Sequence, residues 1–137
     1  MEPQGLSAAQ RALIVTLLAP LQPSFVYLFG SAQRGELRPE SDVDVAFYHH
    51  EPVDPFTLLS AREALAAALS RDVDLVELRG ANDVLRAQVV GRGEVLSARE
   101  PQVLYERQMR WLKQYAMLNR ERAPIIERIK REGTIYG

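Results

Sequence analysis

The distribution of apolar residues along the chain predicts three strands separated by helices. Residues 25–29 form an unbroken apolar run rich in aromatic and branched side chains, which is typical of a buried strand. Residues 42–47 begin with alternating polar and apolar side chains, which indicates a strand with one solvated face. Residues 73–78 predict a third strand, and residues 94–96 form a further short segment.

The helices are indicated by their caps and by apolar residues at helical spacing. Ser7 and Gln10 form a capping box before a helix that Pro20 ends. Asp54 and Pro55 are an N-cap and a first residue typical of a helix start. The predicted helices cover residues 7–18, 31–34, 56–70 and 83–90, and a long helix begins after residue 101.

The segment after residue 101 predicts an amphipathic helix. One helical stripe carries apolar residues three, four or seven positions apart: Leu104, Trp111, Tyr115 and Leu118. We expect Pro124 to break or kink this helix, with a short last helix after it. A second apolar set has two readings of equal weight, an interface with another protein or an ordinary exposed face: Tyr105, Met109 and Leu112.

Together these elements predict an α/β (α+β) protein with a small mixed sheet flanked by helices and a C-terminal helical extension. A chain of 137 residues suits one domain with a real core. Within that single domain, we expect residues 1–98 to form the core. Residues 99–137 are expected to pack on this core or on a partner.

Composition excludes several classes of protein. The chain has no cysteine, so disulfide scaffolds and thiolate metal sites are excluded. We find neither a basic leader nor an apolar run near the ~20 residues of a membrane span, and we therefore expect a cytoplasmic protein. Residues 1–98 carry 8 basic and 13 acidic side chains, a net of −5, whereas residues 99–137 carry 9 and 5, a net of +4. This asymmetry fits either a charged partner or a solvated, arginine-rich helix.

Two aspartates at the start of the second strand are candidate metal ligands. Side chains at positions i and i+2 of a strand leave the same face, so Asp42 and Asp44 point together. Val43 and Val45 then point into the core. Paired carboxylates hold hard cations such as Mg²⁺, although exposed acids at a strand end are the plain alternative.

A glycine and a serine directly after the first strand suggest a phosphate site. Gly30 lets a phosphate approach the backbone, and a helix that starts at Ser31 presents unpaired N–H groups. Arg34, one turn on, adds a charged fork for a phosphate oxygen. The alternative is a plain strand-to-helix turn capped by Ser31. The ten residues between Ser31 and Asp42 are enough to bring the second strand back beside the first, so phosphates and metal would meet there.

Nucleotidyl transfer requires a third acid, because the attacking hydroxyl needs its own metal contact or base. Asp74 is the preferred candidate, since it lies within the third predicted strand, where an unpartnered acid would be costly. Asp72 lies on the same face but at the strand end, where we expect it to be solvated. Glu77 falls on the opposite face.

Three segments together resemble the DNA polymerase β-like nucleotidyltransferase superfamily: Phe29–Gly35, Ser41–Val45 and Val73–Val76. More narrowly, the chain resembles the minimal nucleotidyltransferases, MntA-type antitoxins found beside HEPN-domain ribonuclease toxins in prokaryotes. The resemblance covers residues 25 to about 115. It depends chiefly on a Gly-Ser pair followed, ten residues later, by Asp-x-Asp.

The resemblance implies a polymerase β-like nucleotidyltransferase fold and a role for each matched residue. Gly30 and Ser31 would bind the triphosphate of ATP. Asp42 and Asp44 would hold Mg²⁺, with two ions expected. Asp74 would complete the metal site or activate the acceptor hydroxyl. The implied acceptor is a tyrosine of a cognate HEPN toxin, which receives AMP and is thereby neutralised.

Two other functions remain open from the sequence. In the first, the chain is a binding module that masks its partner and uses nucleotide only for stability. In the second, it is a nucleotidyltransferase that acts on RNA or a small molecule. The intact set of three acids favours transfer over masking, because masking does not require Asp74. Direct binding of nucleic acid and contact with a membrane are not expected.

Overall fold

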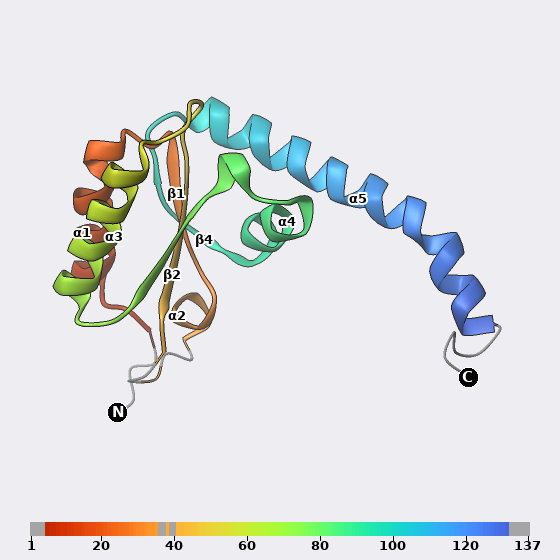
Figure 1. Ribbon diagram of the computed structural model, residues 1–137, viewed down its shortest axis with the longest axis horizontal. Coiled ribbons are helices and arrows are strands. Elements are labelled where there is room, and N and C mark those ends of the chain that lie inside the picture. Colours follow the sequence, from red (N-terminus) through yellow and green to blue (C-terminus); the bar gives the residue numbers. More distant parts are fainter. Residues whose placement is uncertain (1–4, 36–37, 39–40, 132–137) are drawn as a thin grey trace.

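The computed structural model describes residues 5–35, 38 and 41–131 (Figure 1). The elements follow in the order α1 (Ala8–Leu18), β1 (Phe25–Phe29), α2 (Ser31–Arg34), β2 (Val43–Tyr48), α3 (Pro55–Leu69), β3 (Val73–Glu77), α4 (Asp83–Arg92), β4 (Glu94–Ala98) and α5 (Pro101–Arg131). Two short 3₁₀ turns, η1 (Ala19–Leu21) and η2 (Leu78–Gly80), follow α1 and β3. The three predicted strands and the predicted helices before residue 101 are confirmed.

The strands form one mixed sheet in the order β3-β2-β1-β4. β1 pairs antiparallel with β2 and with β4, whereas β2 and β3 run parallel. The short segment at residues 94–96 is therefore part of a fourth strand, which the apolar pattern alone did not identify as one. Because β2 and β3 are parallel, α3 crosses between them as the helix of a βαβ unit.

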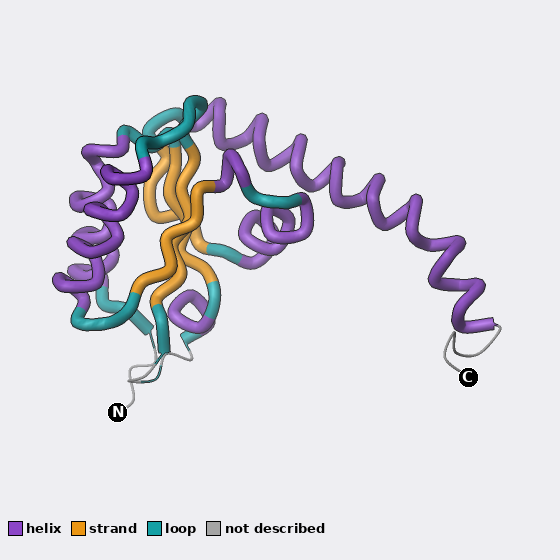
Figure 2. The backbone as a smooth tube through the Cα atoms, viewed as in Figure 1, coloured by secondary structure: helices purple, strands orange, loops and turns teal. Residues whose placement is uncertain are grey.

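Helices cover both faces of the sheet and create two cores (Figure 2). α1 and α3 lie on one face, over a cluster that includes Val43, Val45 and Phe47. α4 and the first part of α5 lie on the other face, over a cluster centred on Phe25 and Trp111. The predicted mixed sheet flanked by helices is thus confirmed.

Local sequence signals explain where the helices begin. The side chain of Ser7 accepts a hydrogen bond from the backbone of Gln10, and the side chain of Gln10 accepts one from the backbone of Ser7. Asp54 caps α3 through the backbone N–H of Thr57. Asn82 caps α4 in the same way. These caps satisfy N–H groups that would otherwise lack partners at the first turn.

α5 is packed on the body at its start and projects away from it afterwards (Figure 1). Trp111 is 2% exposed and lies with its ring edge-on to Phe25 and Tyr48, at 6.2 and 5.8 Å between ring centres. Gln108 donates a hydrogen bond of 2.7 Å to the hydroxyl of the buried Tyr27. Although α5 has 31 residues, neither it nor any other helix in the described part of the chain is apolar enough to cross a membrane.

Of the two outcomes expected at Pro124, a break and a kink, the helix does not break. α5 continues through Pro124 to Arg131, and Figure 1 shows it changing direction over its last turns. Proline removes one backbone hydrogen bond, to the carbonyl of Arg120 one turn earlier. Residues 120–124 are exposed, so water can solvate that carbonyl oxygen and the helix bends instead of stopping.

Candidate active site

The turn between β1 and α2 depends on a glycine. Gly30 has φ 76° and ψ −152°, in a region that side-chain-bearing residues rarely adopt. A Cβ atom at this position would overlap the Oδ2 atom of Asp44 and lie 3.1 Å from its Cγ. Gly30 therefore allows the carboxylate of Asp44 to lie directly against the backbone at the end of β1.

α2 is a single turn that starts at Ser31, as predicted. Gly30 occupies its N-cap position, and Gly35, also at positive φ, ends it. The half-buried Ser31 thus sits at the point where backbone N–H groups lack helical partners. Arg34 is the last residue of α2, and its side chain lies outside the described residues.

Strand register brings two of the predicted acids together. Asp44 is the Cα partner of Phe29 on β1 and of Asp74 on β3. Val43 and Val45 are fully buried in the core beneath α1 and α3, so Asp44 between them faces the opposite side of the sheet, as predicted. Neighbouring strands lie ~4.8 Å apart, which places Asp44 and Asp74 side by side.

Asp42 lies one residue before β2, which starts at Val43 rather than at Asp42 as predicted. Its position is fixed by the backbone, because Val43 donates a 2.9 Å hydrogen bond to the carbonyl of Asp72. Arg71 donates hydrogen bonds to the carbonyl oxygens of Arg38 and Ser41, which ties the segment before β2 to the segment before β3. Asp42, Asp44 and Asp74 thus lie at the same end of the sheet.

The structure corrects the reason given for choosing Asp74. β3 is the last strand on its side of the sheet, and Asp74 is exposed rather than buried within it. Burial therefore does not distinguish Asp74 from Asp72, which is also exposed and directly precedes the strand. Register does distinguish them, because only Asp74 is the direct partner of Asp44.

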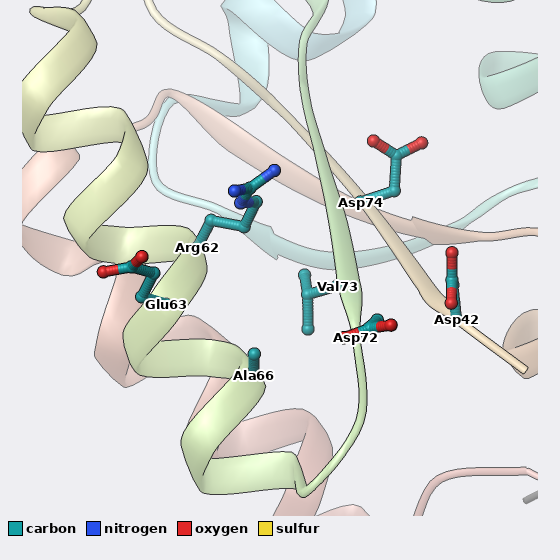
Figure 3. Close-up of a pocket in the computed structure, with 7 residues that line it drawn as sticks. All are labelled: Asp42, Arg62, Glu63, Ala66, Asp72, Val73 and Asp74. Atoms are coloured by element: carbon teal, nitrogen blue, oxygen red, sulfur yellow. The ribbon is translucent and has the colours of Figure 1, made fainter. Parts of the chain in front are cut away.

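A pocket of about 390 Å³ opens beside these acids, between α3 and β3 (Figure 3). Seven residues line it: Asp42, Arg62, Glu63, Ala66, Asp72, Val73 and Asp74. Arg62 and Glu63 were not identified from the sequence, because they lie in the middle of an ordinary amphipathic helix. Their place beside β3 could have been predicted only from the topology of the fold. A helix that crosses between parallel strands must pack alongside the second of them.

The donor set suits a hard cation, although it does not form a complete protein cage. Among the described residues, no group of three His, Cys, Asp or Glu side chains is close enough to hold a metal ion. Mg²⁺ does not require such a group, since it is usually bound by one or two carboxylates together with water and substrate phosphates. Asp44 beside Asp74, next to a turn that can receive phosphate, fits that pattern.

Comparison with known proteins identifies the class to which this site belongs. Residues 13–102 match the family model described as polymerase beta, nucleotidyltransferase, and the chain belongs to this family. The matched segment runs from α1 to the start of α5 and contains every residue of the site discussed above.

Individual relatives narrow the comparison. The chain is 36% identical over 103 residues to the protein adenylyltransferase MntA of Shewanella oneidensis. This match covers 74% of this chain and 73% of the relative. A solved toxin–antitoxin structure with AMP-PNP matches with a TM-score of 0.76 and 34% identity, covering 88% of this chain and 98% of the matched chain. A structure of the tri-AMPylated HEPN toxin of Shewanella oneidensis in complex with the MNT antitoxin matches with a TM-score of 0.73 and 31% identity, covering 89% and 97%. The resemblance to minimal nucleotidyltransferases is confirmed.

Proposed function

We propose that this protein is an adenylyltransferase that transfers AMP from ATP to a tyrosine of a partner HEPN toxin and thereby neutralises it. The observation that carries this proposal is the alignment of Gly30, Asp44 and Asp74 at one end of three adjacent strands. Similarity to an adenylyltransferase and to antitoxins solved with toxin supports the choice of donor and acceptor.

The phosphate-binding part of the site is the turn from β1 into α2. Gly30 leaves the backbone open, and the N–H groups at the start of α2 together with the hydroxyl of Ser31 receive the β- and γ-phosphates of ATP. Arg34, at the end of the same turn, adds a positive charge for a phosphate oxygen. These contacts hold the α-phosphorus in front of β2.

Asp42, Asp44 and Asp74 are the residues that would hold Mg²⁺, with two ions expected. When bound there, the metal would supply positive charge next to the α-phosphate and would lower the pKa of the acceptor hydroxyl. Asp44 lies between its register partners on the two neighbouring strands, Phe29 and Asp74, and it orients the reacting centre. Asp74 receives the acceptor hydroxyl on the outer side.

The reaction is an in-line displacement at the α-phosphorus. The tyrosine oxygen forms a new bond to the α-phosphorus while the bond between the α-phosphorus and the bridging oxygen breaks. Pyrophosphate leaves with the bonding electrons, and the hydroxyl proton passes to a base or to solvent. Strand order favours this geometry, because the phosphate turn follows β1, the central acid lies on β2 and the third acid lies on β3.

We propose that the partner toxin covers a stripe on α5. Three large apolar side chains are exposed there at helical spacing: Tyr105 at 64%, Met109 at 73% and Leu112 at 43%. No described residue of this chain covers them, although they lie in the half of α5 whose other face packs on the sheet. The matching solved chains are similar over nearly their whole length and come from complexes with toxin, which supports a protein occupant. This surface, Tyr105–Met109–Leu112, is called the α5 stripe below.

Intact mass of the partner tests the proposal directly. A candidate HEPN partner is incubated with the chain, ATP and Mg²⁺. We expect its mass to increase in steps of one AMP and its ribonuclease activity to fall in parallel. An unmodified partner that is nevertheless inhibited would contradict transfer and indicate masking. Modification of an RNA or a small molecule in place of the partner would contradict the choice of acceptor.

A further inference from the structure

Beside the third acid, the pocket between α3 and β3 contains one basic residue among the seven that line it. Figure 3 shows Arg62 extending from α3 toward β3, whereas Glu63, the next residue along the helix, points away from the strands. Ala66 lines the pocket one turn after Arg62, and its small side chain leaves the guanidinium accessible. The buried neighbours Ala61 and Leu65 fix this face of α3 against the sheet.

Arg62 has no partner in the described part of the chain. Its guanidinium makes neither a hydrogen bond nor an ion pair there, although four carboxylates line the same pocket: Asp42, Glu63, Asp72 and Asp74. An arginine that served only to stabilise the fold would use some of its five N–H donors on these acids or on a carbonyl oxygen. Arg71 and Arg86 do so elsewhere in the molecule. The donors of Arg62 are available to a ligand.

The position of Arg62 identifies which ligand it meets. Phosphates of ATP are received after β1, at the far side of β2 from β3. Beyond β3 the described chain has no further strand, which leaves the pocket open to an acceptor that approaches Asp74 from that side. Arg62 therefore faces the acceptor and not the triphosphate.

An acceptor tyrosine is uncharged, but a tyrosine that already carries AMP brings a phosphodiester with a negative charge. That charge is repelled by Asp72, which lines the same pocket and is not among the proposed metal ligands. A guanidinium in the same pocket offsets this repulsion and binds phosphate oxygens with two parallel N–H groups. Arg62 thus matters little for an uncharged acceptor and greatly for a nucleotide-bearing one.

We infer that Arg62 binds the phosphate of an acceptor that already carries AMP and so promotes addition of the second and later nucleotides. This inference rests on the proposed function. A related toxin has been solved in a tri-AMPylated state, and we take its three AMP groups as successive additions to one acceptor. In each later step a ribose hydroxyl of the attached AMP attacks the α-phosphorus of a new ATP. A phosphodiester bond forms, the bond to pyrophosphate breaks, and the hydroxyl proton is released.

The test compares successive additions rather than total activity. Time courses of intact mass give separate rates for the first and second AMP on the HEPN partner. We expect Arg62→Gln to lower the ratio of the second rate to the first by about tenfold, the usual scale for loss of a charge-assisted contact. We expect Arg62→Lys to restore part of this ratio, because it keeps the charge but not the planar fork.

Arg79→Gln is the matched control. It removes the same charge from an exposed residue in η2, after the opposite end of β3 from Asp72. We expect its ratio of rates to equal that of the unmodified chain. Raising the salt concentration should lower the ratio for the unmodified chain and change it little for Arg62→Gln, because an exposed ion contact is screened.

Three results would overturn the inference. An unchanged ratio in Arg62→Gln, whether both rates fall together or neither falls, excludes a role in elongation. A partner that receives a single AMP from the unmodified chain also excludes it, while leaving the proposed function intact. If the unmodified chain transfers no AMP, the proposed function fails and this inference fails with it.

Discussion

At the scale of single residues, the site depends on one missing side chain and on one pair of carboxylates. At Gly30 the carboxylate of Asp44 lies against the backbone and leaves no space for a Cβ atom. Asp44 and Asp74 are the acids that strand register sets opposite each other. Each of these features leads to a prediction with a control in the same molecule.

Gly30→Ala should damage the site through both space and backbone conformation. The new Cβ overlaps Asp44, and alanine at φ 76° is strained by about 1–3 kcal/mol. We expect a lower melting temperature and a loss of AMP transfer of at least about tenfold, measured by calorimetry and by initial rates.

Gly91→Ala is the control for that substitution. A Cβ at Gly91, within α4, meets no atom within 4 Å. Because alanine is the better helix former, we expect the free energy of unfolding to rise by about 0.5–1 kcal/mol with unchanged transfer. Equal loss of activity in both glycine variants would show that the β1–α2 turn has no special role.

Asp44→Asn and Asp74→Asn should separate chemistry from folding. Each removes a charge that the proposed reaction needs, and we expect transfer to fall by on the order of 10²–10⁴-fold with little change in thermal stability. Asp72→Asn should retain most activity, since Asp72 is exposed and lies outside the register pair. A larger loss in Asp72→Asn than in Asp74→Asn would reverse the assignment of the third acid. Initial rates at saturating Mg²⁺ decide between them.

At the scale of elements, the two halves of α5 differ in what they contact. Its first half carries the buried Trp111 against the sheet, and its remainder extends beyond the body. The sequence identified the buried stripe correctly, because helical spacing reports directly on the face that a helix buries. It did not decide between a break and a kink at Pro124, because solvation of a single carbonyl oxygen depends on the exposure of that turn.

Met109→Asp should weaken binding of the HEPN partner without unfolding the chain. Met109 is 73% exposed at the centre of the α5 stripe, so a charge there costs the free protein little. In a buried interface the same change is expected to cost about 2 kcal/mol or more, roughly a thirtyfold increase in Kd by titration calorimetry.

Met117→Asp provides the comparison for this surface. Met117 is on the same helix and 49% exposed, but it lies five residues beyond Leu112, the last member of the stripe. We expect its Kd to stay close to that of the unmodified chain. Equal binding by the Met109 and Met117 variants, both unchanged, would place the interface elsewhere.

At the scale of the whole molecule, a hydrogen bond from Gln108 of α5 to the buried Tyr27 of β1 helps to hold α5 on the sheet. Tyr27 is also an ionisable group. Burial raises the pKa of Tyr27 above its ordinary value of 10.0, and the hydrogen bond from Gln108 opposes this to a smaller extent. As the pH rises through 10, the unfolded chain releases the proton while the folded chain keeps it. The contribution of Tyr27 to the free energy of unfolding is therefore fully present below that pH and is lost progressively up to the folded-state pKa.

Tyr27→Phe should change both the level and the pH dependence of stability. Near pH 8 we expect a cost of about 1 kcal/mol from the lost hydrogen bond. Between pH 9.5 and 11, a range set around the ordinary tyrosine value, the decline should be shallower than in the unmodified chain. Urea denaturation at several pH values measures both effects, and parallel curves for the two proteins would contradict the assignment to Tyr27.

Much of this arrangement could be predicted from the sequence, and the exceptions share one cause. Gly30, Ser31, Asp42 and Asp44 lie within fifteen residues, so strand and turn rules place them together. Asp74 was placed on the right strand but for a wrong reason, because an edge strand cannot be told from a central one by its own residues. β4 and Arg62 were missed because their roles depend on which element packs beside them.

The outer edge of β3 has a further consequence for how copies of this chain behave toward one another. An unpaired strand edge offers its N–H and C=O groups to any passing strand, and proteins that leave such edges exposed tend to self-associate. Here the edge is bordered by the charged side chains of Asp72 and Asp74. Like charges on two approaching copies repel and discourage strand addition between them. Asp74, which the proposed chemistry uses, thus also helps Asp72 to discourage self-association.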